Sequence, residues 1–418
     1  MNGWMIGVAL ILAALLYTLI PDLFLHRLGI GSWKRQYSGG VALTFDDGPD
    51  PDYTPKVLEV LASNQATATF FLVGERAEKH PEIVKAIQAQ GHQIGVHCQQ
   101  HGYAWFMGPW ATWRKWDDGV NTIERITGQE VKLIRPPWGT FNLALWLWLK
   151  SRRKRAVLWN VEGHDWKASS SPQQISERIL KRTKEGTIIV LHDSGGESGA
   201  PRHTLQAIEI ICRELREEIK LPLVKLEFPN WSVFRLVAYT LWEKWERLFA
   251  RLNKVERINS TNVLRLSRTR YKGPTLYSQE GRLLAKAGDL VAEIHLDNAR
   301  FLGTETDSQK IALKALRQAK RSLPELASYI VKHPDYKDIQ VFLGLTLINR
   351  GVKGLGFEVQ DVPASLSTRG IAALQSIIKR VYQPPGMRRD TNKAGGQPKL
   401  VWISREELLK RWLGETAI

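Results

Sequence analysis

The chain has 418 residues, a formal net charge of +17 and two cysteines. Its length exceeds what one ordinary core requires, so we expect two folded domains. The excess of Lys and Arg favours anionic partners such as acidic lipid headgroups, wall polymers or nucleic acid, without choosing among them. Cys98 and Cys212 give no disulfide framework and no CxxC metal cluster, and two buried thiols are favoured over a single bridge between them.

The N-terminus has the pattern of a membrane segment. From Met1 to Pro21 there is no charged side chain, and the run MIGVALILAALLYTLI is about long enough to cross a bilayer as one helix. No small-residue cleavage site follows it, which favours an uncleaved anchor over a removed signal peptide. Arg27, Lys34 and Arg35 lie just downstream, where the positive-inside rule alone would place the body of the protein in the cytoplasm, so the charges leave the orientation open.

After the apolar run, short apolar strand patterns alternate with amphipathic helix patterns. Proline in the first turn and glycine past the end mark several of the helices, as in HPEIVKAIQAQG. This alternation predicts a parallel sheet, and seven units suggest an irregular barrel. We expect strands at 41–45, 66–74, 92–96, 131–135, 156–161, 187–191 and 221–226, and helices at 54–63, 80–91, 112–128, 142–155, 171–186 and 203–219.

The segment 231–255 has the pattern of an aromatic, basic amphipathic helix. Trp231, Trp242 and Trp245 could lie at a membrane interface, but a helix that packs two domains together is the favoured interpretation. From about residue 256 the pattern changes to that of a smaller α+β domain. We expect its strands at 263–273, 288–298, 339–350 and 399–403, its helices at 309–333, 371–382 and 404–413, and a loop at 386–399.

Five predicted strands of the first half end on residues suited to metal-assisted hydrolysis. These are Asp46-Asp47, His97, Arg135, Asp165 and His192. Barrels of alternating strands and helices gather their chemistry at the carboxyl ends of the strands, so we expect these side chains to converge. A turn built on Asp-Gly-Pro would explain the acidic pair alone, but not the polar ends of the other strands.

The spacing of two histidines adds a candidate metal site. His97 and His101 are four residues apart, which on one helical turn would point both imidazoles the same way. With one carboxylate they would form a site with open positions for water and substrate, which is the catalytic type. At the end of a strand, Asp46 and Asp47 would point apart, so that one binds the metal while the other faces the water.

These segments resemble the polysaccharide deacetylases with a NodB-homology domain, carbohydrate esterase family 4. The five ordered motifs of that family lie in the same order within residues 39–226, in TFDDGPD, GVHCQQH, RPPWG, VEGHDWK and IIVLHDS. The resemblance implies a base (Asp46), metal ligands (Asp47, His97, His101), an arginine orienting the base (Arg135), a groove aromatic whose amide holds the oxyanion (Trp138), a pair beside the catalytic histidine (Asp165, Trp166) and a general acid (His192).

The sequence departs from the family pattern at several positions. Gly102 stands where proline is usual, Cys98 and Gln99 lie where Ser or Thr often follows the first histidine, and Glu162 stands where aspartate opens the fourth motif. Val190 replaces the leucine that lines the acetyl-methyl pocket, which should loosen the pocket slightly. None of these changes removes a ligand, base or acid.

The resemblance implies a metal-dependent hydrolase that removes N-acetyl groups from N-acetyl-hexosamines of a cell-wall or chitin-like polysaccharide. Zinc is the expected ion, with cobalt or another divalent ion as the alternative. Competing interpretations are an O-acetyl esterase on the same site and a non-catalytic glycan-binding membrane protein. No recognised nucleic-acid motif accompanies the basic run SRRKR, so we expect no nucleic-acid partner.

The expected fold class is α/β: an irregular (β/α)7 barrel catalytic domain, an N-terminal transmembrane helix and a smaller C-terminal α+β domain. Its partners would be acetylated polysaccharide and, through residues 1–25, membrane lipid. We expect a single-pass protein of the cell membrane with its catalytic domain outside the cytoplasm. The expected organisation is an anchor at 1–25, a linker at 26–38, the deacetylase barrel at 39–228, a connecting helix at 229–255 and a domain of unknown role at 256–418.

Overall fold

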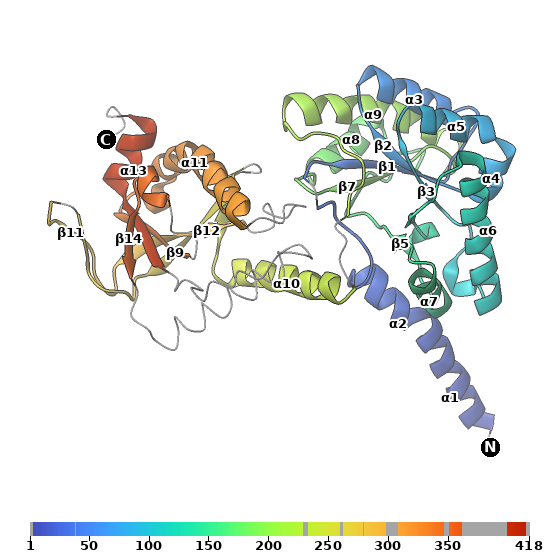
Figure 1. Ribbon diagram of the computed structural model, residues 1–418, viewed down its shortest axis with the longest axis horizontal. Coiled ribbons are helices and arrows are strands. Elements are labelled where there is room, and N and C mark those ends of the chain that lie inside the picture. Colours follow the sequence, from blue (N-terminus) through green and yellow to red (C-terminus); the bar gives the residue numbers. More distant parts are fainter. Residues whose placement is uncertain are drawn as a thin grey trace. The chain divides into compact units, whose positions relative to one another are not determined.

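The computed structural model describes residues 3–37, 39–228, 233–259, 262–278, 280–297, 308–346, 351–361 and 399–414. The chain divides into two compact units, Met1–Phe228 and Pro229–Ile418 (Figure 1). Each unit has its own sheet and its own core, and each is described by itself.

The first unit is built on a curled, parallel, seven-stranded sheet in the order β5-β4-β3-β2-β1-β7-β6. Every neighbouring pair runs parallel, which confirms the expected α/β class with a half-barrel of strands. The strands are β1 (Ala42–Asp46), β2 (Ala68–Leu72), β3 (Gln93–Val96), β4 (Leu133–Ile134), β5 (Arg155–Ala156), β6 (Val161–Glu162) and β7 (Ile188–His192).

Two of the expected strands differ in the structure. The predicted strand 156–161 is divided between β5 and β6, which lie at opposite edges of the sheet. Between them the chain crosses the open side, where Leu158 donates its amide to the Trp33 carbonyl at 2.7 Å. The predicted strand 221–226 makes only an isolated bridge, Val41 with Leu223. Apolar runs of this length do not distinguish a crossing segment from a strand.

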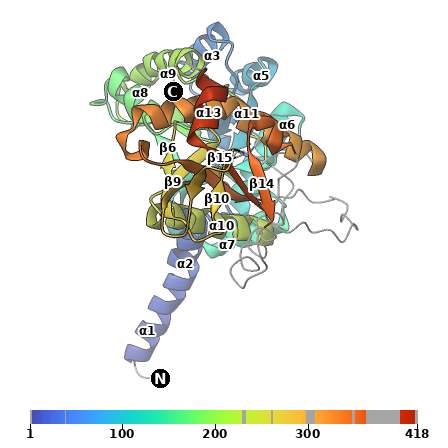
Figure 2. The same ribbon diagram turned by 90° about the vertical axis from the view of Figure 1, so that its left-hand side faces the viewer.

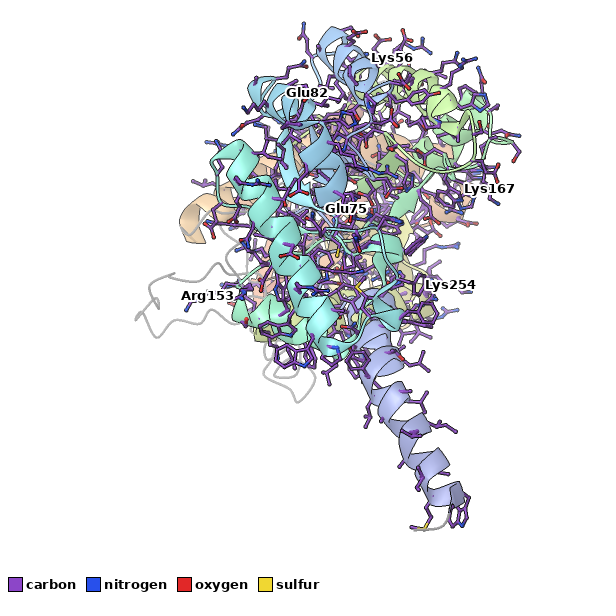
Figure 3. All side chains as sticks on the ribbon, turned by 90° about the vertical axis from the view of Figure 1, so that its right-hand side faces the viewer. Lys56, Glu75, Glu82, Arg153, Lys167 and Lys254 are labelled. Atoms are coloured by element: carbon purple, nitrogen blue, oxygen red, sulfur yellow. The ribbon has the colours of Figure 1, made fainter. Side chains whose placement is uncertain are left out.

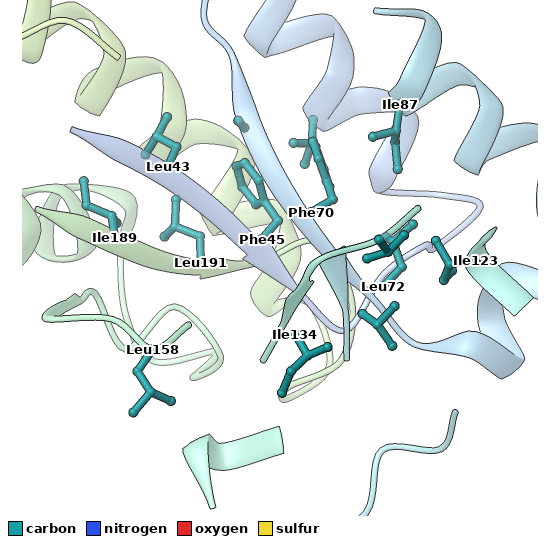
Figure 4. Close-up of a cluster of buried hydrophobic side chains, with 14 of the residues drawn as sticks. Leu43, Phe45, Phe70, Leu72, Ile87, Ile123, Ile134, Leu158, Ile189 and Leu191 are labelled. Carbon is teal, nitrogen blue, oxygen red and sulfur yellow. The ribbon is translucent and has the colours of Figure 1, made fainter. Parts of the chain in front are cut away.

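The two faces of the sheet have different roles, which follow from the alternation of side chains along a strand. In β1, Leu43 and Phe45 belong to the large core beneath the helices, where Figure 4 shows them with Ile189 and Leu191 of β7. Their neighbour Thr44 points to the inner face instead, toward Arg135. The helices are α3 (Thr54–Ser63), α4 (Gly74–Lys79), α5 (Pro81–Ala89), α6 (Pro109–Thr127), α7 (Leu143–Ser151), α8 (Pro172–Leu180) and α9 (Ala200–Glu217).

A long apolar helix precedes the sheet. It runs from Trp4 to Arg27 and, among the described residues, is the one helix long and apolar enough to cross a membrane. It comprises α1 (Gly3–Ala14), η1 (Leu15–Leu19), α2 (Ile20–Asp22) and η2 (Leu23–Arg27). Figures 1 and 2 show α1 projecting away from the rest of the unit. The helix is consistent with membrane anchoring.

The segment between this helix and β1 is packed against the sheet. Ser32, Trp33 and Gln36 are each less than a twentieth exposed. Trp33 forms a parallel bridge with Val157 and donates its amide to the Ala156 carbonyl at 2.8 Å. Residues 28–37, expected as part of a linker, therefore belong to the folded unit.

The second unit contains a mixed six-stranded sheet in the order β14-β15-β13-β12-β9-β8 and a small hairpin of β10 and β11. Helices α11 and α13 share an apolar core with the larger sheet, which confirms a separate α+β domain. The elements are α10 (Val233–Leu252), β8 (Glu256–Arg257), β9 (Leu264–Arg270), β10 (Leu276–Tyr277), β11 (Leu283–Ala285), β12 (Leu290–Leu296), α11 (Ser308–Lys332), β13 (Val341–Thr346), β14 (Glu358–Asp361), β15 (Lys399–Ser404) and α13 (Arg405–Leu413).

The main strands expected for this unit are present, and α10 matches the helix expected at 231–255. The expected helix at 371–382, nearly all of the loop expected at 386–399, and Trp231 lie outside the described residues. In α10, Tyr239 is buried whereas Trp245 is 49% exposed. A membrane-interface role for Trp242 and Trp245 stays a prediction.

Candidate active site

The carboxyl ends of four strands of one sheet, β4, β3, β1 and β7, bring the predicted site residues together. Asp46 ends β1 and lies opposite His192, the last residue of β7. His97 directly follows β3, and Arg135 directly follows β4. The carboxyl edge of the sheet therefore gathers a carboxylate, two imidazoles and a guanidinium that are far apart in the sequence.

Asp47, His97 and His101 form a group that could hold a metal ion. Their ligand atoms lie within 4.8 Å of one another. The Asp47 Oδ1 atom is 3.3 Å from His97 Nε2 and 3.0 Å from His101 Nε2. Two imidazole nitrogens and one carboxylate oxygen are the donor set of an open, catalytic zinc site.

The hydrogen bonds around the group fit a cation. His97 Nδ1 lies 2.6 Å from the Arg135 carbonyl oxygen, which can only accept, so the proton of the neutral ring is on Nδ1. The lone pair on Nε2 then faces Asp47 Oδ1, an atom that is buried and has no hydrogen-bond partner among the described residues. Two acceptors that face each other require a positive charge between them. A backbone carbonyl that accepts from the other ring nitrogen and so fixes the ring is typical of metal-binding histidines.

The electrostatics of Asp47 agree with this arrangement. Burial alone would raise the pKa of the Asp47 carboxyl, but the close approach of the His101 and His97 rings outweighs it and lowers the pKa well below its usual value. The group therefore stays ionised at neutral pH, as a metal ligand must be.

The local backbone that positions the ligands differs from the expected one. His97 and His101 do not share a helical turn, because the chain from His97 to Tyr103 has no regular structure. Cys98 instead adopts a left-handed φ of 68°, which turns the chain so that both rings face Asp47. Asp47 also has a positive φ, 75°, and Arg76 binds its carbonyl at 2.7 Å. This conformation is uncommon for residues other than glycine.

A buried arginine holds Asp46. Arg135 is fully buried, and its Nη1 donates to Asp46 Oδ1 and to Thr44 Oγ1, each at 2.7 Å. Its Nε donates to the Val157 carbonyl at 3.2 Å, and its guanidinium lies 4.1 Å from the centre of the Phe71 ring. The inner face of the sheet thus fixes one oxygen of a 3%-exposed carboxylate beside the metal group.

His192 pairs with Asp165 on the other side of the site. The carboxylate is buried and accepts from His192 Nδ1 at 3.0 Å, from the His192 amide at 2.8 Å and from Thr204 Oγ1 at 3.0 Å. Burial would lower the pKa of His192, but the charge and hydrogen bond of Asp165 raise it to about 10, with Asp47 and Asp46 adding to the effect. The imidazole is therefore protonated at neutral pH.

Aromatic side chains line the approach to the site. The Trp138 side chain is 50% exposed and packs on His101, with ring centres 4.3 Å apart, and on Tyr103 at 5.0 Å. Trp166 meets the His192 ring edge-on at 5.7 Å. Val190 is buried in β7, where it lies opposite Thr44, so it shares the inner face of the sheet with Asp46 and Arg135.

Some residues of the site were not singled out from the sequence. Asp193 is buried, its Oδ2 accepts from Thr54 Oγ1, and burial raises its pKa to about 7. A Cβ on Gly48 would lie 2.2 Å from that oxygen, so Asp193 packs directly against the turn that carries Asp47. Its position directly after His192 was the available signal. Thr44 and Thr204 gave none, because an isolated threonine in a strand or helix is ordinary.

The two cysteines lie apart from this chemistry. Cys98 and Cys212 are both free and buried, and burial raises the pKa of their thiols to about 11 and about 12. They are two unpaired buried thiols, as the sequence favoured.

Carboxylates and imidazoles gathered around a candidate cation site at the carboxyl ends of parallel strands are typical of metal-assisted hydrolases. Residues 34–157 match the polysaccharide deacetylase family. The chain is 36% identical over 180 residues to a peptidoglycan-N-acetylglucosamine deacetylase of Bacillus cereus, covering 43% of this chain and 82% of the relative. The chain therefore belongs to the polysaccharide deacetylase family and is an enzyme of that family.

Other comparisons extend the likeness. The chain is 33% identical over 167 residues to a chitooligosaccharide deacetylase of Azorhizobium caulinodans, covering 40% of this chain and 79% of the relative. It is 31% identical to the crystal structure of the Bc1960 peptidoglycan N-acetylglucosamine deacetylase, with a TM-score of 0.45, over 49% of this chain and 94% of that one. Residues 235–412 match the YkoP domain, which accounts for most of the second unit.

Proposed function

We propose that this enzyme hydrolyses N-acetyl groups on N-acetyl-hexosamine residues of a cell-wall or chitin-like polysaccharide, with a divalent cation held by Asp47, His97 and His101. The observation that carries the proposal is the convergence of these three ligand atoms beside a carboxylate that Arg135 fixes. The names of the relatives support the substrate class, because they are deacetylases of peptidoglycan and of chitooligosaccharides.

The donor set suits zinc, and cobalt would be accepted by the same nitrogen and oxygen ligands. When bound, such a cation would polarise the acetyl carbonyl and acidify a water molecule. Neither effect is available from the side chains alone, and an acetamide is a poor electrophile without them.

Two residues of the site carry out the proton transfers, Asp46 as the base and His192 as the acid. Asp46 accepts a proton from the attacking water, with Arg135 holding its other oxygen in place. As the carbon–nitrogen bond breaks, His192 donates a proton to the departing amine nitrogen, which would otherwise leave as an unstable anion. Asp165 keeps His192 charged for this step. The products are acetate and a free amine.

The aromatic walls account for binding of the sugar. Trp138 packs on His101 and Trp166 on His192, and the half-exposed side chain of Trp138 is available to stack on a pyranose ring. The backbone amide of Trp138 is the proposed donor to the oxyanion. Val190 is the proposed contact for the acetyl methyl group, in a pocket slightly wider than leucine would leave.

We also propose a location and a division of the chain. Residues 1–25 anchor the protein in the cell membrane as a single span, and the catalytic domain at 39–228 lies outside the cytoplasm, where the polymer is. The segment 26–38 connects them, 229–255 connects the two folded units, and 256–418 forms the appended domain. The orientation can be tested by fusing to the C-terminus a reporter that is active only in the cytoplasm. Activity of this reporter would show that the proposed orientation is wrong.

Acetate release by the detergent-solubilised full-length enzyme tests the activity. We expect release from peptidoglycan and chitin oligomers, an equal yield of new amines, loss of both on chelation and recovery on addition of zinc. Release from acetyl-xylan without amine formation from the other two polymers would identify an O-acetyl esterase instead. Full activity after exhaustive chelation would contradict the cation.

The variant Asp46→Asn tests the division of roles. We expect it to retain the metal, because it leaves all three ligands in place, and to lose turnover by about 10²–10⁴-fold, because it removes the base. Asp52→Asn makes the same change at an exposed carboxylate and should have full activity. Metal content by elemental analysis separates the outcomes, since parallel loss of metal and turnover would mean that Asp46 is a ligand.

A further inference from the structure

The second half of the N-terminal helix is docked on the deacetylase unit. The Tyr17 hydroxyl donates to the Met107 carbonyl at 2.8 Å. Asp22 accepts from the Phe141 amide at 3.0 Å and from the Trp105 indole at 3.4 Å. Leu25 is buried as well. The helix is thus in contact with the unit from about Tyr17 onward.

The length of the helix that extends beyond the unit indicates how close the unit would lie to the membrane. Trp4 to Leu16 stand clear of the unit, and at ~1.5 Å per residue they extend about 20 Å. The hydrocarbon core of a bilayer is about 30 Å thick. If residues 4–27 form the proposed span, its remaining third comes from the docked part, which would place the surface of the unit beside Tyr17 at or within the membrane boundary.

The outer face of the docked part is suited to lipid. Leu19, Ile20, Leu23 and Phe24 are each between 42% and 48% exposed, while Tyr17 and Asp22 face the unit. The apolar surface therefore continues past the level at which the helix meets the protein. A helix docked in water would carry polar side chains on that face.

The unit exposes aromatic side chains at the same level. Phe106 is 87% exposed and belongs to η3 (Ala104–Phe106), which contacts η1. Trp110 is 90% exposed, near the start of α6 and three residues after Met107. Leu147 of α7, a helix that also contacts η1, is 48% exposed. Large aromatic side chains at this position are typical of a membrane interface.

We propose that the deacetylase unit rests on the lipid bilayer through Phe106, Trp110 and Leu147, which we call the bilayer-facing surface. The inference rests on the proposed membrane anchor and adds a second, independent contact with lipid. Figure 1 shows α7 and one end of α6 next to α2, and Figure 3 shows the labelled Lys56 and Glu82 at the end of the unit opposite to α1.

The bilayer-facing surface is linked to the active site by one loop. Phe106 contacts Tyr103, with ring centres 5.6 Å apart, and Tyr103 contacts Trp138 at 5.0 Å. Trp138 in turn packs on His101. A glycan bound against Trp138 would therefore be separated from the lipid only by Tyr103 and Phe106. The enzyme would then act on acetylated sugars that lie close to the membrane.

Depth-dependent fluorescence quenching in proteoliposomes tests the inference. The full-length protein would carry one introduced cysteine at a time, Phe106→Cys, Trp110→Cys, Ile11→Cys, Lys56→Cys or Glu82→Cys, labelled with a polarity-sensitive dye. Both native cysteines are buried, so the unsubstituted protein gives the background labelling. The vesicles would contain phosphatidylcholine and phosphatidylglycerol, with nitroxide quenchers placed either near the headgroup or deep in the acyl chain.

We expect the dyes at 106 and 110 to be quenched about twofold or more above those at 56 and 82, most strongly by the shallow nitroxide, and the dye at 11 by the deep nitroxide. Quenching at 11 with none at 106 or 110 would overturn the inference and leave the anchor in place. No quenching at 11 would overturn both. Protection of 106 and 110 from aqueous iodide without lipid quenching would mean that protein covers them, which also overturns it.

Discussion

We expect Asp165→Asn to move the alkaline limit of activity to lower pH. In the native enzyme the pKa of His192 is raised from its ordinary 6.5 to about 10, so the proton donor stays charged, and activity should persist until the pH rises through that value. An opposite charge in contact raises the pKa of a histidine by about 1–3 units, so neutralising Asp165 should lower the limit by that amount. The amide can still accept from the His192 backbone and Thr204, which preserves the fold.

The amide also reverses one hydrogen bond. With its oxygen held by those two donors, the asparagine presents NH₂ to His192 Nδ1, which favours a neutral ring that accepts there. A neutral ring is a poor acid, so kcat should fall by about 10²-fold or more above the new limit. The same charge pair contributes to folding stability, fully below pH 6.5 and decreasingly as the pH rises through about 10. The variant should lack this increment.

Initial rates of acetate release from a chitin oligomer, measured between about pH 6 and about pH 11, provide the assay. Glu162→Gln is the matched control, because it makes the same chemical change three residues away at a carboxylate that faces His164 instead, at 3.4 Å. It should leave the alkaline limit where it is. A folded Asp165→Asn enzyme with the native limit would refute the assignment of His192 as the acid that Asp165 charges.

Three further substitutions probe the site. His97→Ala should lower zinc affinity by about 10-fold or more, measured by competition with a chelating dye. His80→Ala is the control and should leave the affinity unchanged, because the His80 ring faces Glu82. Equal affinities of the two variants would exclude His97 as a ligand. Arg135→Met should lower the free energy of unfolding by about 3–5 kcal/mol in urea titrations, because it leaves a buried carboxylate unpaired, and a change under about 1 kcal/mol would mean that the ion pair is not needed for folding. Gly119→Ala should weaken zinc binding at a stability cost of about 1–3 kcal/mol, because its Cβ would lie 2.8 Å from the Gln99 amide in the loop between the two histidines; unchanged zinc affinity would show that this loop can yield.

The order of strands and helices in the first unit could be predicted from periodicity, and the polar strand ends predicted which residues converge. Periodicity could not predict that residues 156–161 leave one edge of the sheet and join the other, because a crossing segment is as apolar as a strand. The spacing of His97 and His101 predicted correctly that their rings converge, but the helical turn on which this prediction rested is absent. A left-handed residue at Cys98, not a helical turn, brings the rings together, and no sequence rule places cysteine there.

The supports of the site were harder to predict than the site itself. Arg135 reaches Thr44 and two carbonyls only because the curled sheet brings β1, β4 and the segment after β5 around one point. These contacts depend on tertiary geometry, which leaves no local pattern in the sequence. The docking of Asp22 on the Phe141 amide is of the same kind, because a lone aspartate after an apolar run gives no indication of its partner.

The packed connection between the apolar helix and β1 determines how the enzyme would search for its substrate. Ten flexible residues would let a domain wander by roughly 17 Å from its point of attachment. With Trp33 bridged to Val157 and Ser32 and Gln36 buried, that freedom is absent. If the helix is inserted as proposed, the active site would keep a constant height above the lipid and would move only laterally with the helix. Polymer layers farther from the membrane than the active site would then be out of reach. The enzyme would deacetylate only the layer of glycan at that height, and would search it by lateral diffusion.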